Sequence, residues 1–183
     1  MNKLQTSKVW WACACLVTLP VAHAANISNA DYTAGKARIS TGYKTDRATC
    51  DSQSGNAKDI CVQEAKAKEK VALAELEYSH TGKPGDRNKV FVARAESAYA
   101  VAKERCDDLA GNAKDVCVKE AKAVEIKALA DAKMGKEIGD ARQDAAAEKL
   151  DADYKVAIEK CDALAGDAKN GCVAAAKARF GRN

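Results

Sequence analysis

The amino-acid sequence predicts an all-α protein built from three disulfide-tied antiparallel helical hairpins, arranged as an up-and-down bundle or as an elongated array. Three observations predict this fold. The chain repeats with a period of 55–56 residues, each repeat carries a pair of cysteines, and the composition is rich in the helix formers Ala, Lys and Glu. A fixed period of this size is typical of stacked copies of one supersecondary unit.

Cysteines set the register of the repeat. The first cysteine of each pair is followed by ten residues and then by the second: Cys50 and Cys61, Cys106 and Cys117, Cys161 and Cys172. A tyrosine stands seven residues before each first cysteine: Tyr43, Tyr99 and Tyr154. We therefore divide the chain into repeat units of about 28–79, 86–134 and 140–180, which together form one helical-hairpin domain over 25–183.

Each pair of cysteines encloses a predicted bend. The bend contains a glycine followed by Asn or Asp: Gly55 and Asn56, Gly111 and Asn112, Gly166 and Asp167. Glycine adopts the left-handed backbone conformation that often ends a helix. Asn and Asp accept a backbone N–H at a helix start, so we expect them to cap the second arm of each hairpin.

The first unit begins with a predicted helix over about 28–52, where Ser28 and Asp31 have the spacing of a capping box. Its second arm is predicted over about 57–78. The segment 79–85 contains two glycines and a proline and should end that arm, with His80 in the loop and Asp86 capping the next helix.

The second unit has the clearest helical periodicity. Apolar side chains recur at spacings of three and four along its first arm: Phe91, Ala95, Ala98, Ala102, Cys106 and Leu109. This stripe places Cys106 on the face that packs against the second arm. Between units two and three, Gly135 and Gly139 occur without a proline. Both a turn and a continuous helix fit this junction.

Three chemistries compete for the six cysteines of the repeats. Structural disulfides are favoured, because the two cysteines of a hairpin face each other across antiparallel arms and close a short loop. A metal site would need thiolates from two units, since each bend offers only two. Redox catalysis lacks a Cys-x-x-Cys motif. We expect no metal, no cofactor and no catalytic residue.

The N-terminus has the pattern of a secretion signal. Lys3 and Lys8 precede an apolar run over 9–21, and the small residues Ala22 and Ala24 fit a cleavage site after Ala24. The sequence thus predicts a signal peptide over 1–24, a periplasmic location and no stable membrane span after cleavage. An oxidising compartment also favours disulfides.

The charge pattern argues against nucleic acid as a partner. The chain has 30 basic and 26 acidic residues, and they alternate along the predicted helices as on solvated faces. A nucleic-acid-binding domain needs a basic face instead. The sequence leaves open the protein or envelope partner and the oligomeric state.

Two segments, 98–110 and 112–123, resemble a group of small exported proteins of Gram-negative bacteria, some of which are labelled TolA-like cell-envelope proteins. The resemblance covers nearly the whole chain after the leader and implies a helical protein of the envelope. It identifies no functional residues.

The sequence therefore predicts a non-enzymatic protein with a structural, stress-related or protein-interaction role in the cell envelope. Two other functions stay open. One is a carrier for an apolar or amphipathic small ligand held between the arms, and the other is a thiol-based metal or redox buffer.

Overall fold

The fold of this protein comes from a computed structural model, which describes residues 26–182. The predicted signal peptide over 1–24 and its cleavage site lie outside the described residues. The elements are the α-helices α1 (Asn29–Thr49), α2 (Gly55–Thr81), α3 (Pro84–Cys106), α4 (Gly111–Cys161) and α5 (Gly166–Arg179), with a short 3-10 helix η1 (Cys50–Ser52) after α1.

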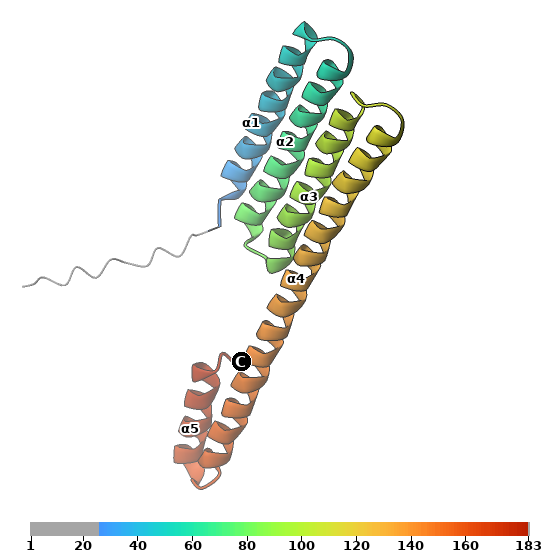
Figure 1. The fold of residues 1–183 in the computed structure, drawn as a ribbon. Helices are drawn as coiled ribbons and strands as arrows, with labels where there is room; N and C mark the ends of the chain where they lie inside the picture. The colour runs from blue at the N-terminus through green and yellow to red at the C-terminus, as the bar shows by residue number, and fades with distance from the viewer. Residues whose placement is uncertain (1–25, 183) are drawn as a thin grey trace, which may run out of the picture.

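The helices form an elongated array (Figure 1). In the part of the chain that the structure describes, each long helix packs only against its neighbours in sequence, so α1, α2, α3 and the first half of α4 lie in a row. The second half of α4 leaves this row as a single rod, and α5 folds back along its far end. The predicted all-α fold with three tied hairpins is confirmed, and of its two forms the structure has the elongated one.

The junction between units two and three is continuous helix. Helix α4 has 51 residues and includes both Gly135 and Gly139, where helical backbone runs on without positive φ angles. Its length is about 76 Å at the usual rise per residue. The second arm of unit two and the first arm of unit three are thus two halves of one helix.

The core is thin, as the alanine-rich composition requires. The three largest side chains that are fully buried are the first cysteines of the three pairs, Cys50, Cys106 and Cys161. The other buried apolar side chains are small: Ala65, Val90, Ala93, Ala95, Ala132 and Ala176. Such a core removes little apolar area from water, so the covalent links carry a larger share of the stability.

The turn between α2 and α3 is tight and well specified. Gly82 ends α2 with a left-handed φ of 62°, and its N–H donates to the Tyr78 carbonyl. Pro84 is the first residue of α3, where the missing N–H of proline has no consequence. The chain therefore reverses within two residues, which brings α3 against α2.

Four predicted end residues have different roles in the structure. Asn56, Asn112 and Asp167 do not cap their helices, because α2, α4 and α5 begin one residue earlier, at the glycine. The N-cap positions are Ser54, Ala110 and Ala165, and no side chain makes a capping hydrogen bond there. Likewise, Lys83 is the N-cap of α3, and Asp86 lies inside its first turn.

His80 lies in the last turn of α2, although the sequence predicted a loop position. Its ring stacks on Tyr32 with 4.4 Å between ring centroids, and its Nδ1 is 3.1 Å from the Ile27 carbonyl oxygen. These contacts to the start of α1 explain why the helix continues past Tyr78. The predicted cap at Ser28 is confirmed, since its Oγ accepts the N–H of Asp31 at 3.1 Å.

Candidate functional site: the disulfide-tied bends

The three bends are the most distinctive feature of the structure, and all three have the same covalent geometry. Disulfides join Cys50 to Cys61, Cys106 to Cys117 and Cys161 to Cys172, with Cα–Cα distances of 5.6, 5.7 and 5.7 Å. These are the pairings that the sequence predicted, and the distances lie in the usual range for disulfides. Each link closes a hairpin beside its bend.

The glycine of each bend has the predicted left-handed conformation. The φ angles of Gly55, Gly111 and Gly166 are 56°, 54° and 56°. A side chain at these positions would be strained whatever the space around it, because Cβ crowds the backbone when φ is positive. Because the three angles are nearly equal, the bends repeat in backbone conformation as well as in sequence.

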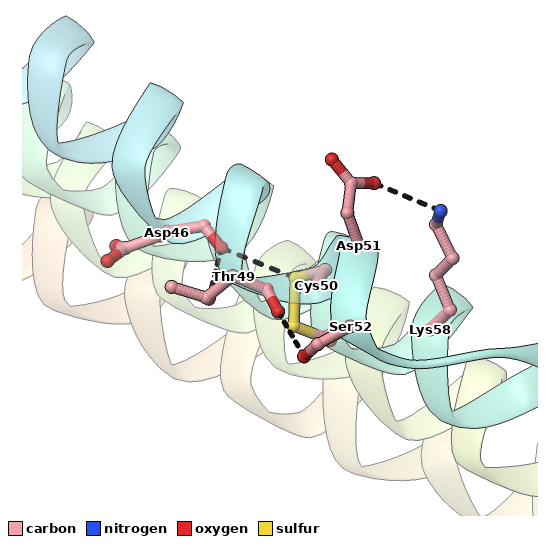
Figure 2. The surroundings of a disulfide bond; sticks show 7 residues. Asp46, Thr49, Cys50, Asp51, Ser52 and Lys58 are labelled. Carbon is pink, nitrogen blue, oxygen red and sulfur yellow. Dashed lines mark hydrogen bonds and ion pairs between the residues drawn. A yellow bond between two sulfur atoms is a disulfide. The ribbon is translucent and has the colours of Figure 1, made fainter.

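An ion pair spans each bend beside the disulfide, and sequence reasoning missed it. Asp51 contacts Lys58 at 3.0 Å in the first bend, as Figure 2 shows. The same positions pair in the other two bends, Asp107 with Lys114 at 2.8 Å and Asp162 with Lys169 at 2.9 Å. The signal was an Asp directly after each first cysteine and a Lys seven residues later.

These ion pairs are exposed to solvent, so each contributes little to the stability of the fold. The Lys58 ammonium, through its hydrogen bond and its charge, lowers the pKa of the Asp51 carboxyl. On the arm that carries Asp51, the Sγ of Cys50 lies 3.4 Å from the Asp46 carbonyl oxygen, and Ser52 donates to the Thr49 carbonyl (Figure 2). These contacts hold the bend rigid, and they supply no group arranged for catalysis.

The repeated tyrosines lie on the first arm of each hairpin, seven residues before the disulfide. The Lys122 ammonium stands 4.7 Å from the ring centroid of Tyr99. Tyr154 packs edge to face with Phe180, at 5.9 Å between centroids, and the Arg182 guanidinium covers it at 5.5 Å. Tyr43 borders a small surface hollow between α1 and α2. The three side chains therefore have different surroundings and form no common platform.

A groove of about 670 Å³ runs between α3 and α4 where α4 leaves the row. Phe91 and small side chains such as Ala98 and Ala128 line it, together with charged side chains of both signs: Arg87, Arg94, Lys136, Asp131 and Asp140. An apolar or amphipathic ligand of moderate size would fit its chemistry.

Helix α4 carries most of the exposed large apolar side chains. Of the eleven that are exposed among residues 26–182, seven lie on it: Val116, Val124, Ile126, Met134, Ile138, Leu150 and Val156. Nevertheless, none of the described helices is both long and apolar enough to cross a membrane. The apolar side chains of α4 alternate with charges, as on a helix that packs against other helices.

Cation ligands do not gather anywhere in the described chain. Between residues 26 and 182, no three side chains of His, Cys, Asp or Glu are placed to hold a metal ion together. All six cysteines of this part are in disulfides, so none of them offers a thiolate.

Comparisons with known proteins return no match: no family model, no curated protein and no solved structure is similar to this chain. The fold and the bends define its class, an all-α protein of disulfide-tied helical hairpins. Disulfides of this kind are consistent with an extracytoplasmic protein.

Proposed function

We propose that this chain is a non-enzymatic periplasmic protein with a structural or protein-interaction role in the cell envelope, including under stress. The supporting observation is α4, a 51-residue helix that belongs to two hairpins at once. It holds the row of α1 to α3 at one end and the α5 hairpin at the other (Figure 1). Such a molecule would hold the surfaces of its two packed ends at a fixed distance from each other. This is the role of a spacer and requires no catalysis.

Disulfides suit this task in an oxidising compartment. A thin core would let isolated hairpins open, and each link limits the freedom of the opened chain. The two ends of the rod therefore stay folded without a large hydrophobic core. The arrangement supports a rigid spacer or scaffold.

The test is a deletion strain of the source bacterium complemented with three versions of the gene. The first is intact, the second lacks residues 2–24, and the third lacks 18 residues of α4, five helical turns, which shortens the rod by about 27 Å and keeps the face of the helix in register. We expect the intact protein in the periplasmic fraction, and restored resistance to detergent with EDTA only from the intact gene.

Full complementation by the leaderless gene contradicts the periplasmic role, and full complementation by the shortened gene contradicts the spacer role. A photo-crosslinking residue at Ile126, which is 56% exposed, identifies the envelope partner in the same strains. Turnover of substrates by the purified protein in a hydrolase or oxidoreductase screen would contradict the non-enzymatic assignment.

The groove between α3 and α4 favours a second candidate, a carrier for an apolar or amphipathic small molecule. Phe91, which is 44% exposed, and several alanines line it beside charged side chains of both signs. Native mass spectrometry of protein purified from cells should then show an added mass. The variant Ala98→Trp, which fills the groove, should lose that mass, while Ala123→Trp on another exposed face should keep it. A bare mass for the wild type excludes this function.

A third candidate, the thiol-based metal or redox buffer, needs free thiols. Titration of the native protein with a thiol reagent tests it directly. We expect no reaction from the six cysteines of the repeats, and reactive thiols among them would favour the buffer.

A further inference from the structure

The contact between units one and two shows how neighbouring hairpins recognise each other. Three ion pairs join α2 to α3: Glu64 with Arg105 at 2.6 Å, Glu75 with Arg94 at 2.6 Å, and Lys70 with Glu96. In addition, the Asn56 side chain at the bend of unit one donates to the Glu104 carbonyl at 3.1 Å. This polar frame surrounds a contact between small apolar side chains.

Units two and three carry the same frame in their sequences. One repeat further on, Glu64 and Arg105 become Glu120 and Lys160, and Glu75 and Arg94 become Asp131 and Lys149. Asn56 and Glu104 become Asn112 and Glu159. Two of the three ion pairs therefore keep their signs. The third is lost, because Ile126 replaces Lys70 and Asp151 pairs with Lys155 and Arg182 instead.

The continuous helix keeps these partners apart. Glu120 and Lys160 lie in the same helix, separated along its axis by about 60 Å at the usual rise per residue. Glu120, Asp131, Lys149 and Lys160 are all exposed, and none forms an ion pair with another described residue. Within one chain of this shape, the acids of unit two therefore cannot pair with the bases of unit three.

All four charges lie on one stripe of α4. With 3.6 residues per turn, their directions around the helix axis agree within about 40°. The same stripe contains exposed apolar side chains, namely Val116 (45% exposed), Met134 (55%), Ile138 (46%) and Val156 (54%). We call these eight residues the α4 stripe.

Three of the four apolar side chains of the stripe have counterparts in units one and two that are partly covered; the counterpart of Ile138 is the exposed Gly82. Ile60 and Tyr78 stand one repeat before Val116 and Met134, and both are half-buried in α2, which packs against α1 and α3. Val101 stands one repeat before Val156 and is half-buried. The α4 stripe thus has the chemistry of a surface that a neighbouring hairpin covers.

We propose that a second copy of this chain covers the α4 stripe, with the two α4 helices antiparallel. Glu120 and Lys160 lie 20 residues on either side of residue 140, and Asp131 and Lys149 lie nine residues on either side. An antiparallel pair with its twofold axis near residue 140 therefore aligns both acids of each copy with both bases of the other. Unit three of each copy then packs on unit two of its partner, as unit two packs on unit one.

The charges select a second copy over other occupants. The N-terminal half of the stripe is acidic and the C-terminal half is basic, so the stripe is complementary to itself in the reverse direction. Closed twofold pairs of this kind use the same surface on both copies. A uniformly charged surface would meet only one half of the stripe favourably. This proposal does not depend on the spacer function.

Sedimentation velocity of the full oxidised protein tests the proposal, with mass as the readout. The wild type should be a dimer at 100 µM and low salt. The affinity of the dimer should fall in 0.5 M NaCl, because salt screens exposed ion pairs. Two charge variants follow. E120K/D131K makes all four charges positive, and K149E/K160E makes all four negative.

Each variant alone should dimerise about 100-fold more weakly than the wild type, since four attractive pairs become repulsive. Mixed in equal amounts, the two variants should form a heterodimer with affinity close to that of the wild type, because every aligned pair again has opposite signs. The control D115K/D144K makes the same change in net charge as E120K/D131K, but on the opposite face of α4. It should dimerise as the wild type does.

Three results would overturn the proposal. The first is a monomeric wild type, which includes a compact monomer whose unit three folds back on its own unit two. The second is a dimer that both charge variants leave intact, which places the contact elsewhere. The third is a mixture of the two variants that stays monomeric although each variant shows the wild-type circular dichroism.

Discussion

The turn between α2 and α3 and the middle of α4 occupy equivalent places in the repeat, yet the chain reverses only at the first. At the first junction, Gly82 has a left-handed φ of 62° and Pro84 begins the next helix. One repeat further on, the chain has Ile138, Gly139 and Asp140, and the helix continues. The second junction thus lacks both the left-handed glycine and the proline of the first, and the nearby Gly139 does not end the helix by itself.

The energetic costs of glycine and of proline inside a helix differ in the same sense as the two junctions. A glycine inside a helix costs about 1 kcal/mol relative to alanine, whereas a proline costs about 3 kcal/mol, because it has no N–H to donate to the carbonyl four residues earlier and its ring clashes with that carbonyl. Gly135 and Gly139 therefore weaken α4 without ending it. The same weakness makes the middle of α4 the place where a single substitution should have the largest effect.

Gly139→Pro should break α4 at its centre. The proline ring would clash with the carbonyl of Gly135 and remove one backbone hydrogen bond, at a cost of about 3 kcal/mol. Hydrogen–deuterium exchange should show amides around 135–143 exchanging about 100-fold faster, with α2 and α3 unchanged. The matched variant Gly139→Ala should slow the same amides, since a Cβ there meets no atom within 4 Å. Equal exchange in both variants would contradict the role given to proline.

The third hairpin should depend on its disulfide more than the first hairpin does. Helix α5 has 14 residues and packs only against α4 among the described helices, whereas α2 is held by both α1 and α3. The pair Cys161→Ser/Cys172→Ser removes about 3 kcal/mol of loop-closure stabilisation. A helix as short as α5 is marginal by itself.

We therefore expect α5 amides to lose about 100-fold of their exchange protection in that variant. The matched pair Cys50→Ser/Cys61→Ser should leave the protection of α2 close to that of the wild type, because α3 still packs against it. Similar losses in both hairpins would show that packing between units does not compensate for a missing disulfide.

Glycines in the two regions should respond in opposite ways to alanine. Gly35 of α1 is buried against α2, and a Cβ there would come within 2.6 Å of Leu76 Cδ1. Gly135 of α4 is exposed and a Cβ there would meet nothing within 4 Å. Gly35→Ala should lower the free energy of unfolding by about 1 kcal/mol through overpacking, and Gly135→Ala should raise it by about 0.5–1 kcal/mol. Urea denaturation of both variants measures the difference, and equal signs would contradict it.

Much of this fold could be predicted from the sequence because its signals are local. The cysteine spacing, the bend glycines and the helix-forming composition each act within a few residues, and the three disulfides followed from them. The exact helix starts could not be predicted, since Gly55 begins α2 and leaves Asn56 free to reach Glu104, 48 residues away. His80 was misplaced for the same reason, because its stacking partner Tyr32 lies 48 residues earlier.

The junctions also differ in how they respond to pH, and this effect should be the smallest. Asp86 at the first junction is 7% exposed, accepts the Thr81 hydroxyl at 2.6 Å and pairs with Lys89 at 2.7 Å. The hydrogen bond from Lys89, followed by that from Thr81, lowers the pKa of the Asp86 carboxyl below its usual value of 3.8. Its stabilisation is therefore complete above about pH 5 and is lost as the pH falls through the lowered pKa.

Asp86→Asn should reduce the midpoint of thermal unfolding by a few degrees at pH 7, and the difference from the wild type should shrink steadily below pH 4. Asp144→Asn is the matched control, because Asp144 lies on an exposed face of α4 and forms no ion pair with another described residue. That variant should follow the wild type at every pH. A difference between Asp86→Asn and the wild type that stays constant from pH 7 to pH 2 would mean that the carboxylate charge does not hold the α2–α3 turn. The turn would then depend on Gly82 and Pro84 alone.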